Sequence, residues 1–161
     1  MDPENLEVFV LRSRSMWRYN DLGVLESDCS LLEELGYKKT DLDFQGLKTD
    51  SDLHRLFAAQ LSFPDYYGNN LDALNDCLCG LEVVNARGRI LVLRNFDSCI
   101  LDQPEIATSV LDILAGAIWS HLARSERMFV FVHTDDEEIE LPEIGKFTPV
   151  LNHSERVSKL G

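Results

Sequence analysis

The residues best placed to do chemistry lie between positions 56 and 86, where the chain has no lysine or arginine but has four acids and two adjacent tyrosines. The acids are Asp65, Asp72, Asp76 and Glu82, and the tyrosines are Tyr66 and Tyr67. Uncompensated carboxylates attract cations, and aromatic side chains supply rigid contact area. This composition is typical of a surface that binds a basic partner.

Asp72 and Asp76 are four residues apart, so they share one face of any helix that contains both. If that helix begins near Asn70, Asp72 lies in its first turn, where the positive end of the helix dipole favours a carboxylate. Asp76 lies one turn later and has no such gain. A like charge at this spacing lowers the stability of the helix by about 0.2 to 0.5 kcal/mol. Two interpretations remain open: the carboxylates are solvated and their repulsion is screened, or Asp76 serves a partner.

Catalytic and metal-binding interpretations are weaker. An acid and base pair at Asp72 and Asp76 would lack the apolar surroundings that separate two pKa values. The histidines that could act with a cysteine nucleophile are His54, His121 and His133. None of them has an orienting group next to it in the sequence. A calcium site formed by Asp72, Asp76 and Glu82 would need more oxygen ligands and a glycine-bearing loop. From these arguments together we expect no enzyme, no metal and no cofactor.

The whole chain is acidic, with 28 acids against 15 bases among 161 residues and a net charge of −13. The phosphate backbone repels a polyanion, so direct binding to nucleic acid is disfavoured. The same charge attracts a basic protein and speeds its encounter, although simple solubility would also explain it.

Cysteine usage and the N-terminus predict a cytoplasmic protein. The cysteines are Cys29, Cys77, Cys79 and Cys99. They form no CxxC pair and no array with zinc-site spacing, so we expect reduced thiols. Asp2, Glu4 and Glu7 stand where a signal peptide needs basic residues. We expect that no apolar run approaches the roughly 20 residues of a membrane span, so no membrane partner is expected.

Helices and strands alternate in the predicted domain, residues 40–134. A short strand is predicted at residues 40–44, and short apolar runs predict strands at residues 90–93 and 128–133. Capping residues and apolar residues at helical spacing predict helices at about residues 50–61, 70–81 and 104–121. Strands that alternate with helices predict an α/β fold, with a small parallel or mixed sheet covered by helices.

The segments on either side are predicted as additions to this domain. Residues 1–39 contain a strand-like run at residues 8–11 and a short helical pattern that Gly36 can end. About 39 residues need help to fold, so we expect this extension to pack on the core. Residues 135–161 begin with four acids and have little periodicity, which predicts an acidic, loosely packed tail.

The sequence FPDYYGNNLDALNDCLCG at residues 63–80 resembles the signature of the barstar family of intracellular ribonuclease inhibitors. The tetrapeptide SDLH at residues 51–54 precedes it at the family's distance. A weaker resemblance continues through residues 92–93 and 109–111 to the strand at residues 129–132. The resemblance implies a compact α/β domain with a three-stranded parallel sheet, whose second helix and preceding loop block a ribonuclease active site.

The resemblance also implies which residues contact the enzyme. They are Tyr66, Asn70, Leu71, Asp72, Asp76 and Gly80. The implied principle is phosphate mimicry, in which carboxylates take the place of a polyanionic substrate among basic groups. The expected partner is therefore a small, basic ribonuclease. It could be the cell's own enzyme or an incoming toxin, and in the second case the chain would be an immunity protein.

Three positions depart from the family pattern. Asn75 and Leu81 stand where the family has tryptophans, and Gly116 stands where it has a glutamate, with only Asp112 one turn earlier. Large aromatic anchors often dominate an interface, and here two are missing. The alternative function is therefore a barstar-like interaction or regulatory module that inhibits no nuclease.

Overall fold

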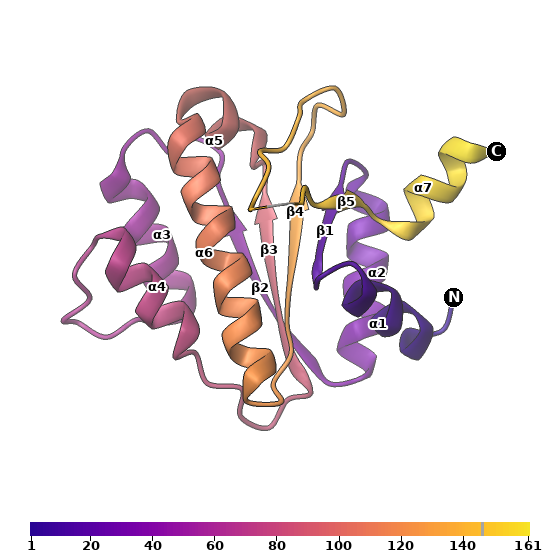
Figure 1. Cartoon of the computed structure of the whole chain (residues 1–161), viewed down its shortest axis with the longest axis horizontal. Coiled ribbons are helices and arrows are strands. Elements are labelled where there is room, and N and C mark those ends of the chain that lie inside the picture. The colour runs from indigo at the N-terminus through magenta and orange to yellow at the C-terminus, as the bar shows by residue number, and fades with distance from the viewer. Residues whose placement is uncertain (146) are drawn as a thin grey trace.

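The computed structural model describes residues 1–145 and 147–161, which form one α/β unit (Figure 1). The helices are α1 (Pro3–Arg12), α2 (Leu22–Glu34), α3 (Asp50–Leu61), α4 (Leu71–Cys79), α5 (Asp97–Asp102), α6 (Pro104–Ala123) and α7 (His153–Leu160). The strands are β1 (Met16–Tyr19), β2 (Tyr37–Asp43), β3 (Gly88–Arg94), β4 (Met128–His133) and β5 (Val150–Leu151). They form one parallel sheet in the order β2-β3-β4-β1-β5.

Both faces of this sheet are apolar, and helices cover both of them (Figure 1). Every residue of β4 is buried, and its side chains alternate between the two faces. Met128 and Val130 pack with α3, α4 and α6, whereas Phe129 and Phe131 pack with α1 and α2. A strand with no polar face requires a layer of helices on each side.

The predicted three-stranded sheet is wrong in its strand number, because the sheet has five strands. β1 pairs with β4, with Trp17 opposite Phe131, and β5 pairs with the other edge of β1. Trp17 is completely buried. The two additional strands come from the flanking segments, which lie outside the resemblance that implied three strands.

The strand predicted at residues 8–11 is also wrong, because these residues lie in α1. Asp2 caps this helix by accepting a hydrogen bond from the Asn5 N–H at 2.9 Å, and Pro3 occupies its first turn. Leu6 and Val10, four residues apart, are buried on one face. A short apolar run does not by itself distinguish a buried strand from a helix.

Residues 135–161, predicted as a loosely packed tail, contribute β5 and α7 to the fold. Leu141, Ile144 and Asn152 in this segment are buried. α7 has no buried residue and projects from the body of the molecule (Figure 1). The segment thus combines an edge strand and buried contacts with a helix that lies on the surface.

The elements predicted between residues 40 and 134 are present, with β2 beginning at Tyr37. Thr49 starts α3 with a capping box, in which its hydroxyl accepts from the Asp52 N–H and the Asp52 carboxylate accepts from the Thr49 N–H. Pro104 stands at the start of α6. The short helix α5 was not predicted, because its six residues carry no clear periodicity.

Among the described residues, α6 is long and apolar enough to span a membrane by length and composition alone. The expectation that no segment reaches this length is therefore wrong. In the fold, α6 packs on the sheet through Val110, Leu114 and Ala117, which are completely buried. Only 39% of its most apolar window is buried, so much of its outer surface is exposed.

Glu7 connects α1 to the beginnings of three strands. Its carboxylate accepts two hydrogen bonds from Arg87, at 2.6 and 2.9 Å, and one from the Tyr37 hydroxyl at 2.5 Å. The Arg127 guanidinium lies 2.8 Å away. The hydrogen bonds from Arg87 are the main reason that the pKa of this buried carboxyl falls to about 2.

Replacing Glu7 should destabilise the protein, because Glu7→Gln leaves two arginines without their carboxylate. We expect a loss of about 2 to 3 kcal/mol in the free energy of unfolding near neutral pH. The folded pKa lies below the ordinary value, so this contribution is present above about pH 4.5 and is lost toward pH 2. Urea unfolding of wild type and variant at both ends of this pH range measures the contribution of Glu7. Glu34→Gln, at an exposed position, is the control, and an equal effect of both substitutions would contradict the assignment.

Candidate partner-binding site

α4 presents both predicted carboxylates to solvent. Asn70 begins the helix by accepting a hydrogen bond from the Ala73 N–H at 2.8 Å. Leu74 and Leu78 are buried against the core. Asp72 and Asp76 lie on the exposed side, one turn apart. The amphipathic pattern of this short helix therefore fixes which residues a partner can reach.

The loop before α4 is held by one tyrosine and exposes the other. Tyr67 is buried, and its hydroxyl lies 2.5 Å from His54 Nδ1 on α3. Asn69 has a left-handed backbone with φ of 52°, which asparagine tolerates better than most residues. Tyr66 is 88% exposed. The buried neighbour fixes the loop while the Tyr66 ring stays available for contact.

α6 fixes the end of α4. The buried His121 donates a hydrogen bond from Nε2 to the Leu78 carbonyl at 2.9 Å, and Arg124 donates to the Cys79 carbonyl at 2.7 Å. Arg124 also donates to His121 Nδ1 at 3.1 Å, which leaves Nε2 as the nitrogen that donates to Leu78. These bonds satisfy carbonyls that the end of a helix leaves free.

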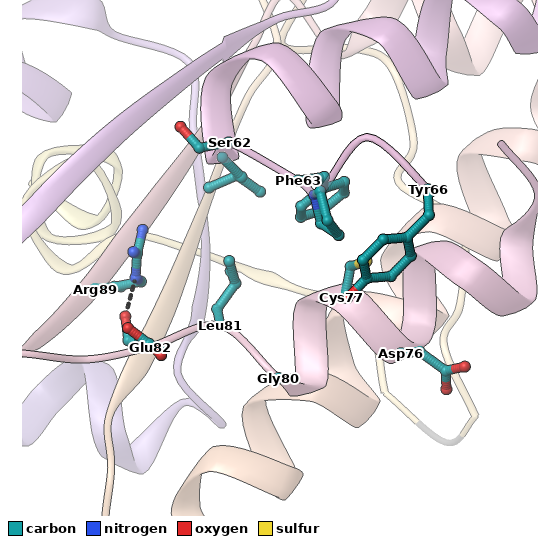
Figure 2. Close-up of a pocket in the computed structure, with 11 residues that line it drawn as sticks. Ser62, Phe63, Tyr66, Asp76, Cys77, Gly80, Leu81, Glu82 and Arg89 are labelled. Atoms are coloured by element: carbon teal, nitrogen blue, oxygen red, sulfur yellow. Dashed lines mark hydrogen bonds between the residues drawn. The ribbon is translucent and has the colours of Figure 1, made fainter. Parts of the chain in front are cut away.

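A groove of about 610 Å³ lies between the loop and the end of α4 (Figure 2). Its walls are formed by Leu61, Ser62, Phe63, Pro64, Tyr66, Asp76, Cys77, Gly80, Leu81, Glu82 and Arg89. The Tyr66 ring extends over Cys77, and the Asp76 carboxylate points away from the groove (Figure 2). Glu82 and Arg89 also line the groove, and Arg89 donates to the Glu82 carbonyl at 2.9 Å.

The structure thus divides the predicted site residues into two groups. Tyr66, Asp76 and Gly80 border the groove. Asn70, Leu71 and Asp72 lie at the start of α4, outside the groove lining. Sequence reasoning missed the other wall residues, among them Leu61, Phe63 and Arg89. Phe63 stands at the start of the quoted signature, but nothing in the sequence places Arg89, from the next strand, beside α4.

The groups considered for catalysis have structural roles or low reactivity. His54 is bonded to Tyr67 and His121 to Leu78, and His133 Nδ1 accepts from the Asn95 N–H at 3.1 Å. Burial raises the pKa of Cys29 to about 12 and that of Cys99 to about 11, which keeps these thiols protonated. Within the described part of the chain, no three potential ligands are grouped as a metal site would need.

A family model described as Barstar (barnase inhibitor) matches residues 37–133. The chain belongs to the barstar family. The resemblance identified from residues 63–80 is thereby confirmed. A Bacillus subtilis (strain 168) relative, named "Putative ribonuclease inhibitor YrdF", is 39% identical over 75 residues, which are 47% of this chain and 76% of that protein.

Two solved structures with little sequence similarity match this chain. The ORC2 protein of Aeropyrum pernix (ADP form) matches with a TM-score of 0.50 and 13% identity over 84% of this chain and 40% of its own. Drosophila ORC bound to AT-rich DNA and Cdc6 gives a TM-score of 0.48 and 15% identity, over 83% of this chain and 46% of its own. This chain spans less than half of either protein. The likeness to ORC2 concerns the α/β fold alone.

The buried His54 should make stability depend on pH. Burial lowers its pKa below 6.5, so on acidification the unfolded chain takes up this proton first. The free energy of unfolding should therefore fall as the pH drops from about 7 to about 5. His54→Gln removes the titrating group, and urea unfolding at both pH values should show a smaller fall for this variant. An equal fall in variant and wild type would contradict this role.

Proposed function

We propose that this chain inhibits a small, basic ribonuclease by covering its active site with the exposed side of α4 and the loop before it. The supporting observation is the pair of solvent-facing carboxylates of Asp72 and Asp76. Neither has an ion-pair partner within residues 1–145 and 147–161. Two unpaired carboxylates on a rigidly held helix are available to the basic groups of a ribonuclease.

Each predicted contact residue has a separate role in this proposal. Asp76 enters the basic pocket, and Asp72 adds negative charge at the start of α4. Tyr66 supplies an exposed aromatic surface, and aromatic side chains are frequent hot spots of interfaces. Asn70, Leu71 and Gly80 complete the contact along the ends of the helix. Because the loop and α4 are already fixed by buried hydrogen bonds, binding costs little further ordering.

Membership of the barstar family and the name of the Bacillus subtilis relative support a ribonuclease as the partner. The net charge of −13 supports a basic enzyme and opposes direct contact with nucleic acid. A cytoplasmic location, as the sequence predicts, would place the inhibitor where its own or an imported nuclease threatens RNA.

The second candidate is an interaction or regulatory module that inhibits no nuclease. The departures from the family pattern favour it. Leu81 is buried, so it presents no large side chain where the family has a tryptophan. Gly116 has open space around it, and Asn75 is small and exposed. A module of this kind would bind through a surface that does not require Asp76.

Asp76→Ala distinguishes these functions. In the inhibitor it removes one member of a desolvated charge pair, so the ribonuclease complex should weaken by about 3 kcal/mol, or roughly 100-fold in Kd. The enzyme is captured from a lysate of the source organism with the wild-type chain, and activity is assayed before and after dissociation. Calorimetric titration of the released enzyme, and of barnase as a defined probe, gives the affinities.

The matched control is Glu138→Ala, which removes the same charge from an exposed position in the loop after β4. It should leave the affinity within about 0.5 kcal/mol of wild type. A loss below about 0.5 kcal/mol for Asp76→Ala would reject the assignment of Asp76. Capture of a partner without nuclease activity, equally well by wild type and Asp76→Ala, would support the second candidate.

Association should be electrostatically steered if an acidic inhibitor meets a basic enzyme. The association rate measured by stopped flow should fall at least about tenfold between low salt and roughly 0.5 M salt, because the screening length shortens to a few ångströms. The dissociation rate should change much less. An association rate that does not depend on salt would be inconsistent with steering by the negative surface.

A further inference from the structure

Two cationic side chains lie next to each other at the beginning of strands β2 and β3. Lys38 of β2 is in register with Arg89 of β3. Residues in register project from the same face of a sheet, and alternation along β3 places Arg89 on the face of Leu91, which α3 to α6 cover. Two neighbouring like charges repel each other. The pair therefore lowers stability unless an anion compensates for it.

Neither cation has a carboxylate partner within residues 1–145 and 147–161. Arg89 uses its Nε to donate to the Glu82 carbonyl at 2.9 Å, and its two terminal nitrogens have no partner in this part of the chain. By contrast, Arg87 and Arg127 at the same end of the sheet are paired with Glu7. In a chain with 28 acids, two adjacent cations without a carboxylate indicate an anion from another molecule.

The half-buried position of Arg89 strengthens this argument. Burial lowers the pKa of Arg89, and the charge of the exposed Glu82 offsets only part of that effect. The guanidinium has thus lost part of its hydration without gaining a full counter-charge. A carboxylate would supply that charge and could accept two parallel hydrogen bonds from the free nitrogens.

The two cations border the groove beside α4. Arg89 lines that groove of about 610 Å³ and also a second hollow of about 170 Å³, which Lys38 lines as well. Figure 2 shows the Arg89 guanidinium extending from Glu82 in the direction of Ser62. The groove also has apolar walls, formed by Leu61, Phe63 and Leu81. Apolar walls beside two cations fit an acidic side chain that has an apolar neighbour.

We propose that Arg89 and Lys38 bind a carboxylate of the ribonuclease that covers α4, from an aspartate or glutamate whose apolar neighbour enters the groove. The inference rests on the proposed function, because Tyr66 and Asp76 border the same groove and a protein bound to them would lie over it. A protein carboxylate fits better than RNA, since the net charge of −13 repels a polyanion. The two cations would thus select, among basic enzymes, those with an acid at this position.

Calorimetric titration of the captured ribonuclease with charge-neutral variants tests the proposal. Arg89→Gln should raise the Kd at least about tenfold, and Lys38→Gln, at an exposed position, about threefold. The direction of the change is informative. Both substitutions make the chain more acidic, so long-range attraction to a basic enzyme would by itself tighten the complex. Lys38 forms no ion pair in the described part of the chain, so its replacement breaks no internal salt bridge.

Lys48→Gln serves as the control, because it removes the same charge from an exposed position just before α3, outside both hollows. It should bind the ribonuclease at least as tightly as wild type does. Circular dichroism of all variants verifies the fold.

Asp76→Ala in the same titration separates this inference from the proposed function. If Asp76→Ala weakens binding while Arg89→Gln and Lys38→Gln bind as tightly as wild type, the carboxylate site is rejected and the inhibitor proposal stands. If Asp76→Ala binds normally while Arg89→Gln and Lys38→Gln are weakened, the carboxylate site stands and the assignment of Asp76 fails. A single-stranded RNA that binds the free wild-type chain and not Arg89→Gln would overturn the assignment to a protein carboxylate.

Discussion

The fold depends on one constraint: its central strands are apolar on both faces, so helices must cover both sides of the sheet. β4 has no exposed residue, and β3 alternates Ile90 and Val92 toward one face with Leu91 and Leu93 toward the other. The region matched by the barstar family contributes α3 to α6, which cover only one face. α1 and α2 cover the other face, so the N-terminal segment is part of the hydrophobic core (Figure 1). The N-terminal segment lies on the opposite side of the sheet from α4, so it leaves the exposed side of α4 free.

The candidate site follows from this layered arrangement. The buried side of α4 rests on the core, its start is capped by Asn70, and its end is bonded to His121 and Arg124 of the neighbouring segment. The loop before it is anchored by the buried Tyr67 and His54. Binding residues that are held by such supports lose little conformational freedom when a partner arrives. The negative charge of Asp76 is therefore presented in a fixed position, which is what an active-site inhibitor needs.

The sequence alone predicts the middle of the fold well, because each element there carries a strong pattern. Apolar spacing and the Thr49 cap define α3, and an unbroken aliphatic run defines β3. The ends were harder to predict. β1 and β5 contain four and two residues, too few for any periodicity, and they are defined by long-range pairing. The carboxylates of α4 could be identified from their spacing, whereas the groove could not, since Arg89 reaches it from another strand.

The most direct test of the central claim is competition between this chain and a nucleotide for the active site of the captured ribonuclease. The enzyme is titrated with the chain at increasing concentrations of a 3′-mononucleotide that occupies the catalytic pocket, and the apparent Kd is measured by calorimetry. If α4 covers the active site, the apparent Kd rises in proportion to nucleotide occupancy, and the complex is inactive. A complex that forms with the same Kd on the nucleotide-bound enzyme, or that still cleaves RNA, would contradict the account.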